Sequence, residues 1–194
     1  MSIARLGAIK SVFFASADAA RALGVSEASA RLACHRYFKK GYLVRPKRDV
    51  YVLADKWKRL ENPELYALAN WLQVPSYVSF QTALSYHQAT TQVQRDFIES
   101  AAVTRTKTLE TGNITFRYMK LDRKLYFGFK RAEGFFMAGP EKAFLDALYL
   151  MSLARYRLDM SALDLQKFNR RKLKTMSHFF SKPTRELLKK ICNI

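Results

Sequence analysis

The sequence predicts an α+β protein in three parts: a basic N-terminal unit of two short helices and a β-hairpin, a mixed module of helices and strands, and a basic helical tail. The spacing of apolar residues changes from helical to alternating at Gly41, which indicates the hairpin. Strand-like runs follow between Phe97 and Met137, and amphipathic helical patterns return after residue 151. We expect one domain over residues 1–60 and a second over residues 61–194, with the tail beginning near residue 151.

The amount and placement of charge indicate a polyanionic partner. The chain has 194 residues, 49% of them apolar, which is enough for a sizeable core, and its formal net charge is +18. Residues 1–60 carry 13 basic and 4 acidic residues (+9), residues 61–150 carry 10 and 9 (+1), and residues 151–194 carry 11 and 3 (+8). This charge exceeds what solubility requires, and nucleic acid is the commonest polyanion. The alternative for each basic cluster is an ordinary solvated face.

Membrane and export signals are not expected. The longest nearly apolar run, residues 144–154, contains Asp146 and is about half of the roughly 20 residues that a membrane-spanning helix needs. The apolar run at residues 12–14 is too short for a signal peptide. Cys34 and Cys192 lie far apart without a CxxC pair, so neither a disulfide framework nor a zinc site is indicated. We expect a cytoplasmic protein with no membrane partner, metal or cofactor.

Two short helices joined by a turn are predicted after a rough helical stripe at residues 3–9 and an apolar link at residues 13–14. Ser16 is a suitable N-cap for a helix over residues 17–23, which Gly24 ends. Ser26 is a suitable N-cap for a second helix, with Glu27 in its first turn, and Gly41 stops that helix after Lys40. This order is the outline of a helix-turn-helix.

The second helix has two distinct faces. Ala30, Ala33, Cys34 and Tyr37 recur at the spacing of a buried stripe, and Leu43 extends that apolar surface. The other side carries residue types that bind DNA, since arginine bonds guanine edges and serine and lysine bond bases or phosphates. Together with the N-cap, the expected DNA contacts of this helix are Ser26, Glu27, Ser29, Arg31, His35, Arg36 and Lys39.

The alternating pattern after Gly41 predicts a hairpin beside this helix. Residues 42–44 and 50–53 form the two strands, and residues 45–49 form a basic tip between them. A hairpin next to a recognition helix describes a winged helix-turn-helix. Its cations Arg45, Lys47 and Arg48 suit phosphate or minor-groove contact. The alternative is a winged helix that contacts only protein.

Three segments, taken together, resemble a known family. "LGVSEASARLACHRYFKKGYLVRPKRDVYVL" (residues 23–53) resembles the N-terminal winged helix of the AbiEi-type antitoxins of bacterial abortive-infection toxin–antitoxin systems. "PSYVSFQTALSYHQ" (residues 75–88) is similar to that family's aromatic-Val-Ser segment, which leads into a helix carrying Ala-Leu and then His. "MAGPEKAFLDALYL" (residues 137–150) is similar to its Pro-Glu-Lys-Ala helix start with a later Leu-Asp. The resemblance covers roughly residues 5–150, with a looser basic tail after it.

The resemblance implies a mixed α/β antitoxin domain after the winged helix and a nucleotidyltransferase-like toxin as partner. The family-motif residues and tail cations that become candidates for partner contact are Tyr77, Ser79, His87, Pro140, Glu141, Lys142, Asp146, Arg170, Arg171, Lys172 and Lys174. The sequence departs from the family pattern at Thr82, where Ser is usual, and at Asp49 and Gln88, where Gly is usual. Because Gly permits a left-handed backbone that Gln adopts poorly, the chain near His87 is expected to differ in shape.

The middle of the chain alternates between helical and strand-like segments. Residues 64–72 are predicted helical, with Pro63 allowed in the first turn, and Ser79 is expected to cap a helix over residues 81–87. Strand-like runs cover residues 97–104, 114–119, 126–129 and 135–137, with a turn at residues 111–113 between the first two. Pro140 and Glu141 begin a helix that reaches about Leu153, and amphipathic helices over residues 169–180 and 183–191 form the tail.

Enzymatic motifs are weak. The seven glycines form neither GxGxxG nor a P-loop, and the three histidines have no metal-ligand spacing. His87 is expected to be a buried, hydrogen-bonded helix residue or, alternatively, a contact to a toxin or ligand. Asp96 with Asp122-Arg123-Lys124 loosely resembles a nuclease in which two carboxylates hold Mg²⁺ and a lysine assists the attacking water. This spacing arises readily by chance, so we do not expect an enzyme.

The leading interpretation is an antitoxin that binds double-stranded operator DNA, represses its own operon and counteracts a toxin, with the basic tail facing an acidic toxin surface. One alternative is a winged-helix transcriptional regulator with a ligand-sensing or dimerising C-terminal domain. The other is the metal-dependent nuclease.

Overall fold

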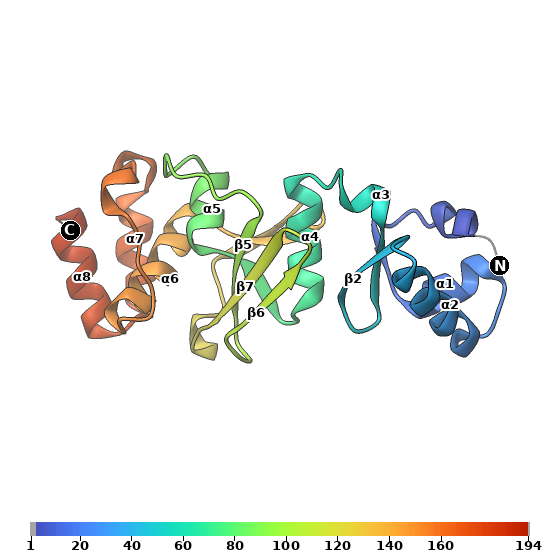
Figure 1. Ribbon diagram of the computed structural model, residues 1–194. Coiled ribbons are helices and arrows are strands. Elements are labelled where there is room, and N and C mark those ends of the chain that lie inside the picture. Colours follow the sequence, from blue (N-terminus) through green and yellow to red (C-terminus); the bar gives the residue numbers. More distant parts are fainter. Residues whose placement is uncertain (1–2, 194) are drawn as a thin grey trace.

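The structure, a computed structural model, describes residues 3–193 as a mixed α+β chain with two β-sheets. The N-terminal helices and the C-terminal helices lie at opposite ends of an elongated molecule, with the larger sheet between them (Figure 1). The α-helices are α1 Ser16–Leu23, α2 Glu27–Lys39, α3 Ala54–Trp57, α4 Asn62–Leu72, α5 Phe80–Tyr86, α6 Pro140–Ser152, α7 Arg170–Ser177 and α8 Lys182–Cys192. The strands are β1 Phe13–Phe14, β2 Leu43–Lys47, β3 Val50–Leu53, β4 Ser76–Val78, β5 Phe97–Ala102, β6 Lys107–Thr111, β7 Ile114–Lys120, β8 Phe129–Ala132 and β9 Phe135–Ala138. Short 3₁₀ helices occur at η1 Ile3–Ala8, η2 Arg123–Leu125, η3 Met160–Ala162 and η4 Leu165–Lys167.

The N-terminal unit packs α1 and α2 against an antiparallel sheet of order β1-β3-β2. The predicted apolar stripe of α2 is confirmed: Ala30, Ala33 and Cys34 are buried, Tyr37 is half-buried, and Leu43 joins the same small core. The Ser26 side chain accepts a hydrogen bond from the Ser29 backbone N–H, as an N-cap does.

The larger sheet has six strands in the order β6-β7-β5-β4-β9-β8. The pairs β5–β7 and β4–β9 are parallel, and the other neighbours are antiparallel. The Tyr118 hydroxyl of β7 donates to the Ala69 carbonyl of α4, so α4 covers one face. Side chains of β4 and β5 on the other face hydrogen-bond α5 and α6, and α7 and α8 pack on α6. The tail is therefore the outer layer of the main core rather than a loose extension.

Strand β3 contributes to both cores. Because alternate side chains of a strand point to opposite faces, Tyr51 enters the small core while Val50 and Val52 enter the large one. The Phe13 ring also lies 4.7 Å from the Trp71 ring of α4, measured between centroids. The hairpin is thus a layer shared by the two units.

Several predicted boundaries are wrong for identifiable reasons. Ser16 is the first residue of α1 and not its cap, because its hydroxyl donates to Glu27; Ala15 takes the N-cap position. Ser79 precedes α5 as expected, yet its hydroxyl bonds Asp146 instead of capping the helix. Gln88 adopts a left-handed backbone, with φ of 54°, so this glutamine does follow the path expected of glycine.

The strand predictions need several corrections. Strands β4 and β6 were not expected, and the turn at residues 111–113 joins β6 to β7 rather than β5 to β7. The run at residues 126–129 is mostly coil, with β8 beginning only at Phe129. At the first hairpin, β2 continues to Lys47, so the tip is the two residues Arg48 and Asp49, and Arg45 and Lys47 belong to the strand.

Candidate nucleic-acid interface and polar pocket

A basic face forms where α2 meets the β2–β3 hairpin. The side chains of Arg31, His35, Arg36, Lys39 and Arg48 are exposed, and Arg45 is half-buried. A hollow of about 440 Å³ lies between helix and hairpin, lined by Arg31, Leu32, His35, Arg45, Arg48, Asp49 and Tyr51. The structure therefore brings six of the predicted DNA-contact residues onto neighbouring elements.

The acidic residues of this face are bonded within the protein. The Asp49 carboxylate accepts from the backbone N–H of Ser16 at 3.1 Å and so ties the hairpin tip to the start of α1. The Glu27 carboxylate accepts from the Ser16 hydroxyl at 3.2 Å and from Arg31 at 2.8 Å. Asp49 has a φ of 60°, which gives the tight turn where the family resemblance suggested glycine. These contacts fix the hairpin against the helices.

Lys47 differs from the other predicted contacts of the hairpin. Its ammonium donates to the Leu72 carbonyl at the end of α4, at 2.9 Å. It also lies close enough to Lys107 of β6 to lower the pKa of that lysine, an effect second to burial. The side chain of Lys47 therefore faces the larger unit and is bonded there.

Four family-motif residues form one buried network. The carboxylate of Asp146 accepts hydrogen bonds from the hydroxyls of Tyr77 (2.9 Å) and Ser79 (2.8 Å) and pairs with Lys142. The Lys142 ammonium also donates to the Tyr77 hydroxyl at 2.8 Å. All four side chains are buried, so in this structure they join β4, the α5 start and α6 from inside.

Burial also dominates the charges of this network. Desolvation lowers the pKa of Lys142 and raises the pKa of Asp146, and their mutual attraction opposes both shifts. The rings of Tyr77, Phe127 and Phe180 lie 5.2–5.3 Å from the ammonium and favour its charged form.

The remaining family-motif residues lie closer to the surface. His87 is half-buried at the C-cap of α5, and its Nε2 is 2.8 Å from the Ala138 carbonyl. Pro140 opens α6, and the buried Glu141 accepts from the Asn169 backbone N–H at 3.0 Å, which fixes α7 to α6. The tail cations Arg170, Arg171, Lys172 and Lys174 are all exposed on α7.

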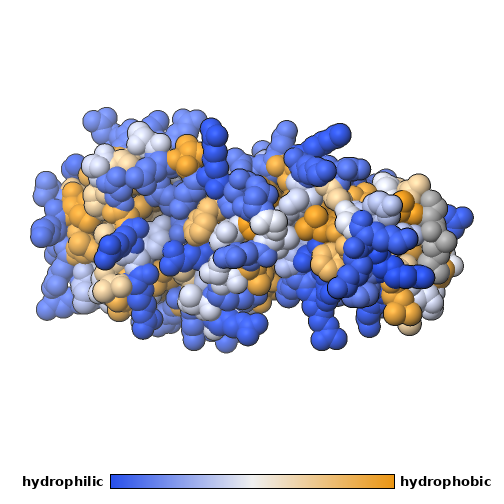
Figure 2. Space-filling view, viewed as in Figure 1, coloured by the Kyte–Doolittle hydropathy of each residue, from blue (hydrophilic) through white to orange (hydrophobic). Residues whose placement is uncertain are grey.

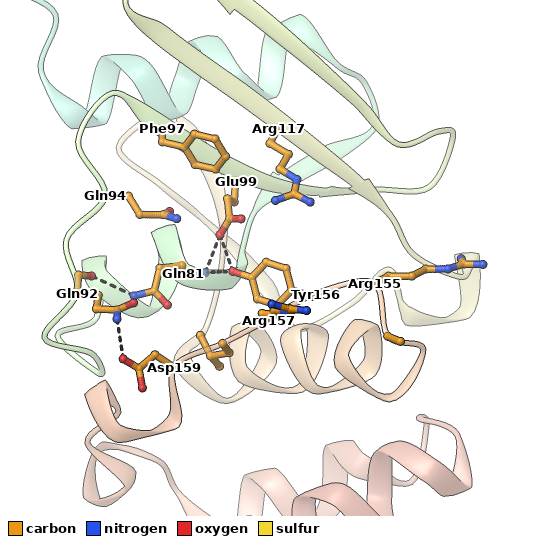
Figure 3. Close-up of a pocket in the computed structure, with 12 residues that line it drawn as sticks. Gln81, Gln92, Gln94, Phe97, Glu99, Arg117, Arg155, Tyr156, Arg157 and Asp159 are labelled. Atoms are coloured by element: carbon orange, nitrogen blue, oxygen red, sulfur yellow. Dashed lines mark hydrogen bonds between the residues drawn. The ribbon is translucent and has the colours of Figure 1, made fainter.

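A second, unpredicted site is a polar pocket of about 450 Å³ around Glu99 of β5 (Figure 3). Glu99 is 1% exposed, and its Oε2 accepts from the Tyr156 hydroxyl at 2.7 Å and the Gln81 backbone N–H at 3.1 Å. Burial raises the pKa of Glu99, and the bonds from Tyr156 and Gln81 and the charge of Arg117 partly offset this. Arg117 lies directly across the parallel register from Glu99, on the same face of the sheet.

The backbone around this pocket is strained at three non-glycine residues. Phe80, Asp96 and Ala154 have φ values of 55°, 56° and 55°. Phe80 lies between Ser79 and Gln81 and so separates the buried network from the polar pocket; Ala154 turns the chain after α6 toward Tyr156. Such positive φ values cost energy and recur at functional sites. They give a geometric signal that no spacing in the sequence carries.

The residues of the nuclease pattern do not come together. In the parallel pair β5–β7, Phe97 lies opposite Thr115 and Ala102 opposite Lys120. Asp96 precedes the start of β5 and Asp122 follows the end of β7, so the length of the strands, roughly 20 Å at about 3.3 Å per residue, separates them. They cannot share one Mg²⁺. Across residues 3–193, no three His, Cys, Asp or Glu side chains are grouped to hold a metal ion.

No protein-family model matches the chain, and no curated protein matches it. None of the helices described over residues 3–193 is long and apolar enough to span a bilayer.

Proposed function

We propose that this protein is a DNA-binding regulator whose N-terminal unit is a winged helix-turn-helix. The observation that carries the proposal is the basic face, in which cations of α2 and of the β2–β3 hairpin flank one hollow. In this reading α2 is the recognition helix and the hairpin is the wing. The order of two helices followed by an antiparallel hairpin, with β1 as third strand, supports it.

The basic face provides the two kinds of contact that DNA recognition needs. Arg31 and His35, one turn apart on α2, would reach base edges, while the exposed Arg36, Lys39 and Arg48 would bond phosphates. Figure 2 shows hydrophilic side chains projecting over the N-terminal end of the molecule. The net charge of +18 adds long-range attraction to a polyanion.

We further propose that the protein acts as an antitoxin, because three ordered segments resemble the AbiEi-type family. It would repress its own operon through operator DNA and counteract a nucleotidyltransferase-like toxin. Arg170, Arg171, Lys172 and Lys174 of α7 form the candidate toxin-facing surface, at the end of the molecule opposite the basic face (Figure 1). The cations at the N-terminus of α7 oppose the helix dipole, and an acidic partner would relieve that cost.

Fluorescence anisotropy tests the DNA proposal. The purified protein is titrated onto the duplex upstream of its own operon and onto a scrambled duplex, at two salt concentrations. We expect the native duplex to bind about a thousandfold more tightly. Arg31→Ala should remove about 1 to 3 kcal/mol of that preference, whereas Arg131→Ala, an exposed arginine of the edge strand β8, is the matched control. Equal affinity for both duplexes would reject the specific-repressor function.

Co-expression tests the antitoxin proposal separately. Where a toxin-like gene lies beside the gene of this protein, cells that express that toxin should be rescued by this protein, and by its Arg31→Ala variant if rescue does not need operator binding. Substituting the four α7 cations by Ala should abolish rescue without changing operator affinity. No rescue alongside intact operator binding would contradict the antitoxin function and leave a transcriptional regulator.

A ligand-sensing transcriptional regulator is the second candidate function. The polar pocket around Glu99 favours it, because a hollow lined by a buried carboxylate and several arginines is suited to a small polar ligand.

A further inference from the structure

The polar pocket around Glu99 holds hydrogen-bonding capacity that the protein itself does not use. Of the two Glu99 oxygens, only Oε2 accepts hydrogen bonds from described residues. Arg117, Arg155 and Arg157 line the same pocket, and over residues 3–193 none of their three guanidinium groups makes a hydrogen bond or an ion pair of 4.0 Å or less. A buried acceptor and guanidinium groups without hydrogen-bond partners thus border one cavity.

The other acidic residue of the pocket is already bonded. Asp159 accepts from the Gln92 side-chain amide at 2.8 Å and from the Ser161 backbone N–H and hydroxyl at 3.0 and 2.6 Å. Its two oxygens are therefore occupied by neutral donors, and no arginine of the pocket pairs with them. Figure 3 shows Arg117 pointing toward the Glu99 carboxylate and Arg155 extending away from it, which leaves Arg117 and Arg157 as the cations of the inner pocket.

From these contacts we propose that the pocket binds a mononucleotide, with its phosphate on Arg117 and Arg157 and a base N–H donating to Glu99 Oε1. A guanidinium group can donate two parallel hydrogen bonds to the oxygens of one phosphate, and a carboxylate selects a base whose edge carries N–H donors. The rings of Phe97 and Tyr156 border the same space and offer surfaces against which a base can pack. Guanine is the favoured base because either of the two N–H donors on its edge can bond the one free oxygen of Glu99, whereas adenine offers a single amino group beside ring acceptors.

The size and polarity of the pocket agree with this ligand class. A volume of about 450 Å³ lies within the range of small-molecule sites. Gln94 also lines the pocket, and its side-chain oxygen accepts from the Thr82 hydroxyl at 3.3 Å. Its amide nitrogen makes no hydrogen bond to a described residue and is therefore a further donor available to a ligand. The site uses arginines and a glutamate from separate elements instead of a glycine-rich loop. No nucleotide motif in the sequence could indicate it.

The pocket is also distinct from the basic face, so this inference does not rest on the proposed DNA binding. Glu99 and Arg117 belong to the central strands of the larger sheet, and Arg157 to the segment after α6. An operator-binding assay and a nucleotide-binding assay can fail independently.

Isothermal titration calorimetry of the full chain tests the proposal with GMP, AMP, guanosine and inorganic phosphate as probes. We expect GMP to bind more tightly than AMP, guanosine or phosphate. Glu99→Gln, which keeps the shape and removes the charge, should weaken GMP about tenfold or more, since hydrogen bonds to charged groups are the strong ones. Because a substitution at the buried Glu99 can also destabilise the fold, two further variants, Arg117→Met and Arg157→Met, test the phosphate end of the site. Each is expected to weaken GMP binding about tenfold and to leave guanosine binding unaffected.

Arg131→Met on the edge strand β8 is the matched control and should bind GMP like the wild type. The proposal is overturned if no probe binds, if phosphate binds as tightly as GMP, if AMP binds at least as tightly as GMP, or if GMP binding survives all three pocket variants. The last result would place the nucleotide on another basic surface.

Discussion

At the scale of single residues, the Lys142–Asp146 pair is a stabilising contact only as long as both partners are present. Both side chains are fully buried, and each has a large desolvation cost that the pairing, Tyr77 and Ser79 offset. We expect Asp146→Ala to destabilise the protein by about 3 to 5 kcal/mol, because it leaves an ammonium buried without its counter-ion. The double variant Lys142→Met with Asp146→Leu should recover most of that loss. Urea denaturation of Lys142→Met, Asp146→Leu and the double variant measures the coupling; additive losses would contradict it.

The raised pKa of Glu99 predicts that the free energy of unfolding depends on pH. Because burial raises its pKa above the ordinary 4.5, the folded protein retains a proton that the unfolded chain has already released. Between pH 4.5 and the raised pKa, this residue makes stability fall as pH rises. We expect the free energy of unfolding of wild type minus that of Glu99→Gln to decrease across this window and to be flat above it. Urea denaturation from pH 4 to pH 8, on the order of one pH unit per step, measures it. Glu110→Gln, exposed on β6, controls for the loss of a glutamate.

At the scale of elements, the helices were predictable where short-range signals decide them. Helix α2 has its cap at Ser26, its buried stripe and the left-handed Gly41, with φ of 75°, all within one segment. Strand β4 is only three residues long, and β6 has the mostly polar sequence KTLET with a single Leu. Neither strand therefore shows the alternation of apolar and polar residues by which a strand is predicted. Ser16 and Ser79 resemble caps in sequence, but their hydroxyls bond residues 11 and 67 positions away. Distant partners of this kind cannot be read from local sequence.

The same distinction applies to the two candidate sites. The basic face comes from one continuous segment, so its residues were predictable from charge and spacing. The polar pocket needs the parallel register that sets Glu99 beside Arg117, and it needs Tyr156, which lies 57 positions from Glu99. Parallel pairing joins segments that share no local pattern, and for that reason the pocket was not expected.

Because β2 ends at Lys47, the neighbouring cations Lys47 and Arg48 of the hairpin are expected to behave differently. Arg48 is exposed at the hairpin tip, whereas Lys47 donates to Leu72 of the larger unit. Arg48→Met should reduce the slope of log affinity against log salt by about one, because one phosphate contact is lost. Lys47→Met should leave the slope unchanged. Anisotropy titrations of the two variants on one duplex separate them, and an equal loss of slope would place Lys47 on the DNA after all.

At the scale of the whole molecule, the shared strand β3 makes the N-terminal unit dependent on the rest of the chain. A fragment of residues 1–60 would expose Val50 and Val52, which are 7% and 0% exposed in the full chain. Each valine contributes about 1.5 to 3 kcal/mol when buried, against a total stability of about 5 to 15 kcal/mol for a domain. The fragment would also lose the contact of Phe13 with Trp71.

We therefore expect this fragment to melt well below the full chain or to self-associate through the exposed face of the hairpin. Circular dichroism melting and analytical ultracentrifugation measure the two outcomes. Replacing Val50 and Val52 by Thr in the fragment should restore a monomer, while the same change in the full chain should destabilise it. A wild-type fragment that is monomeric and melts like the full chain would show that the two units fold independently, and operator binding could then be assigned to residues 1–60 alone.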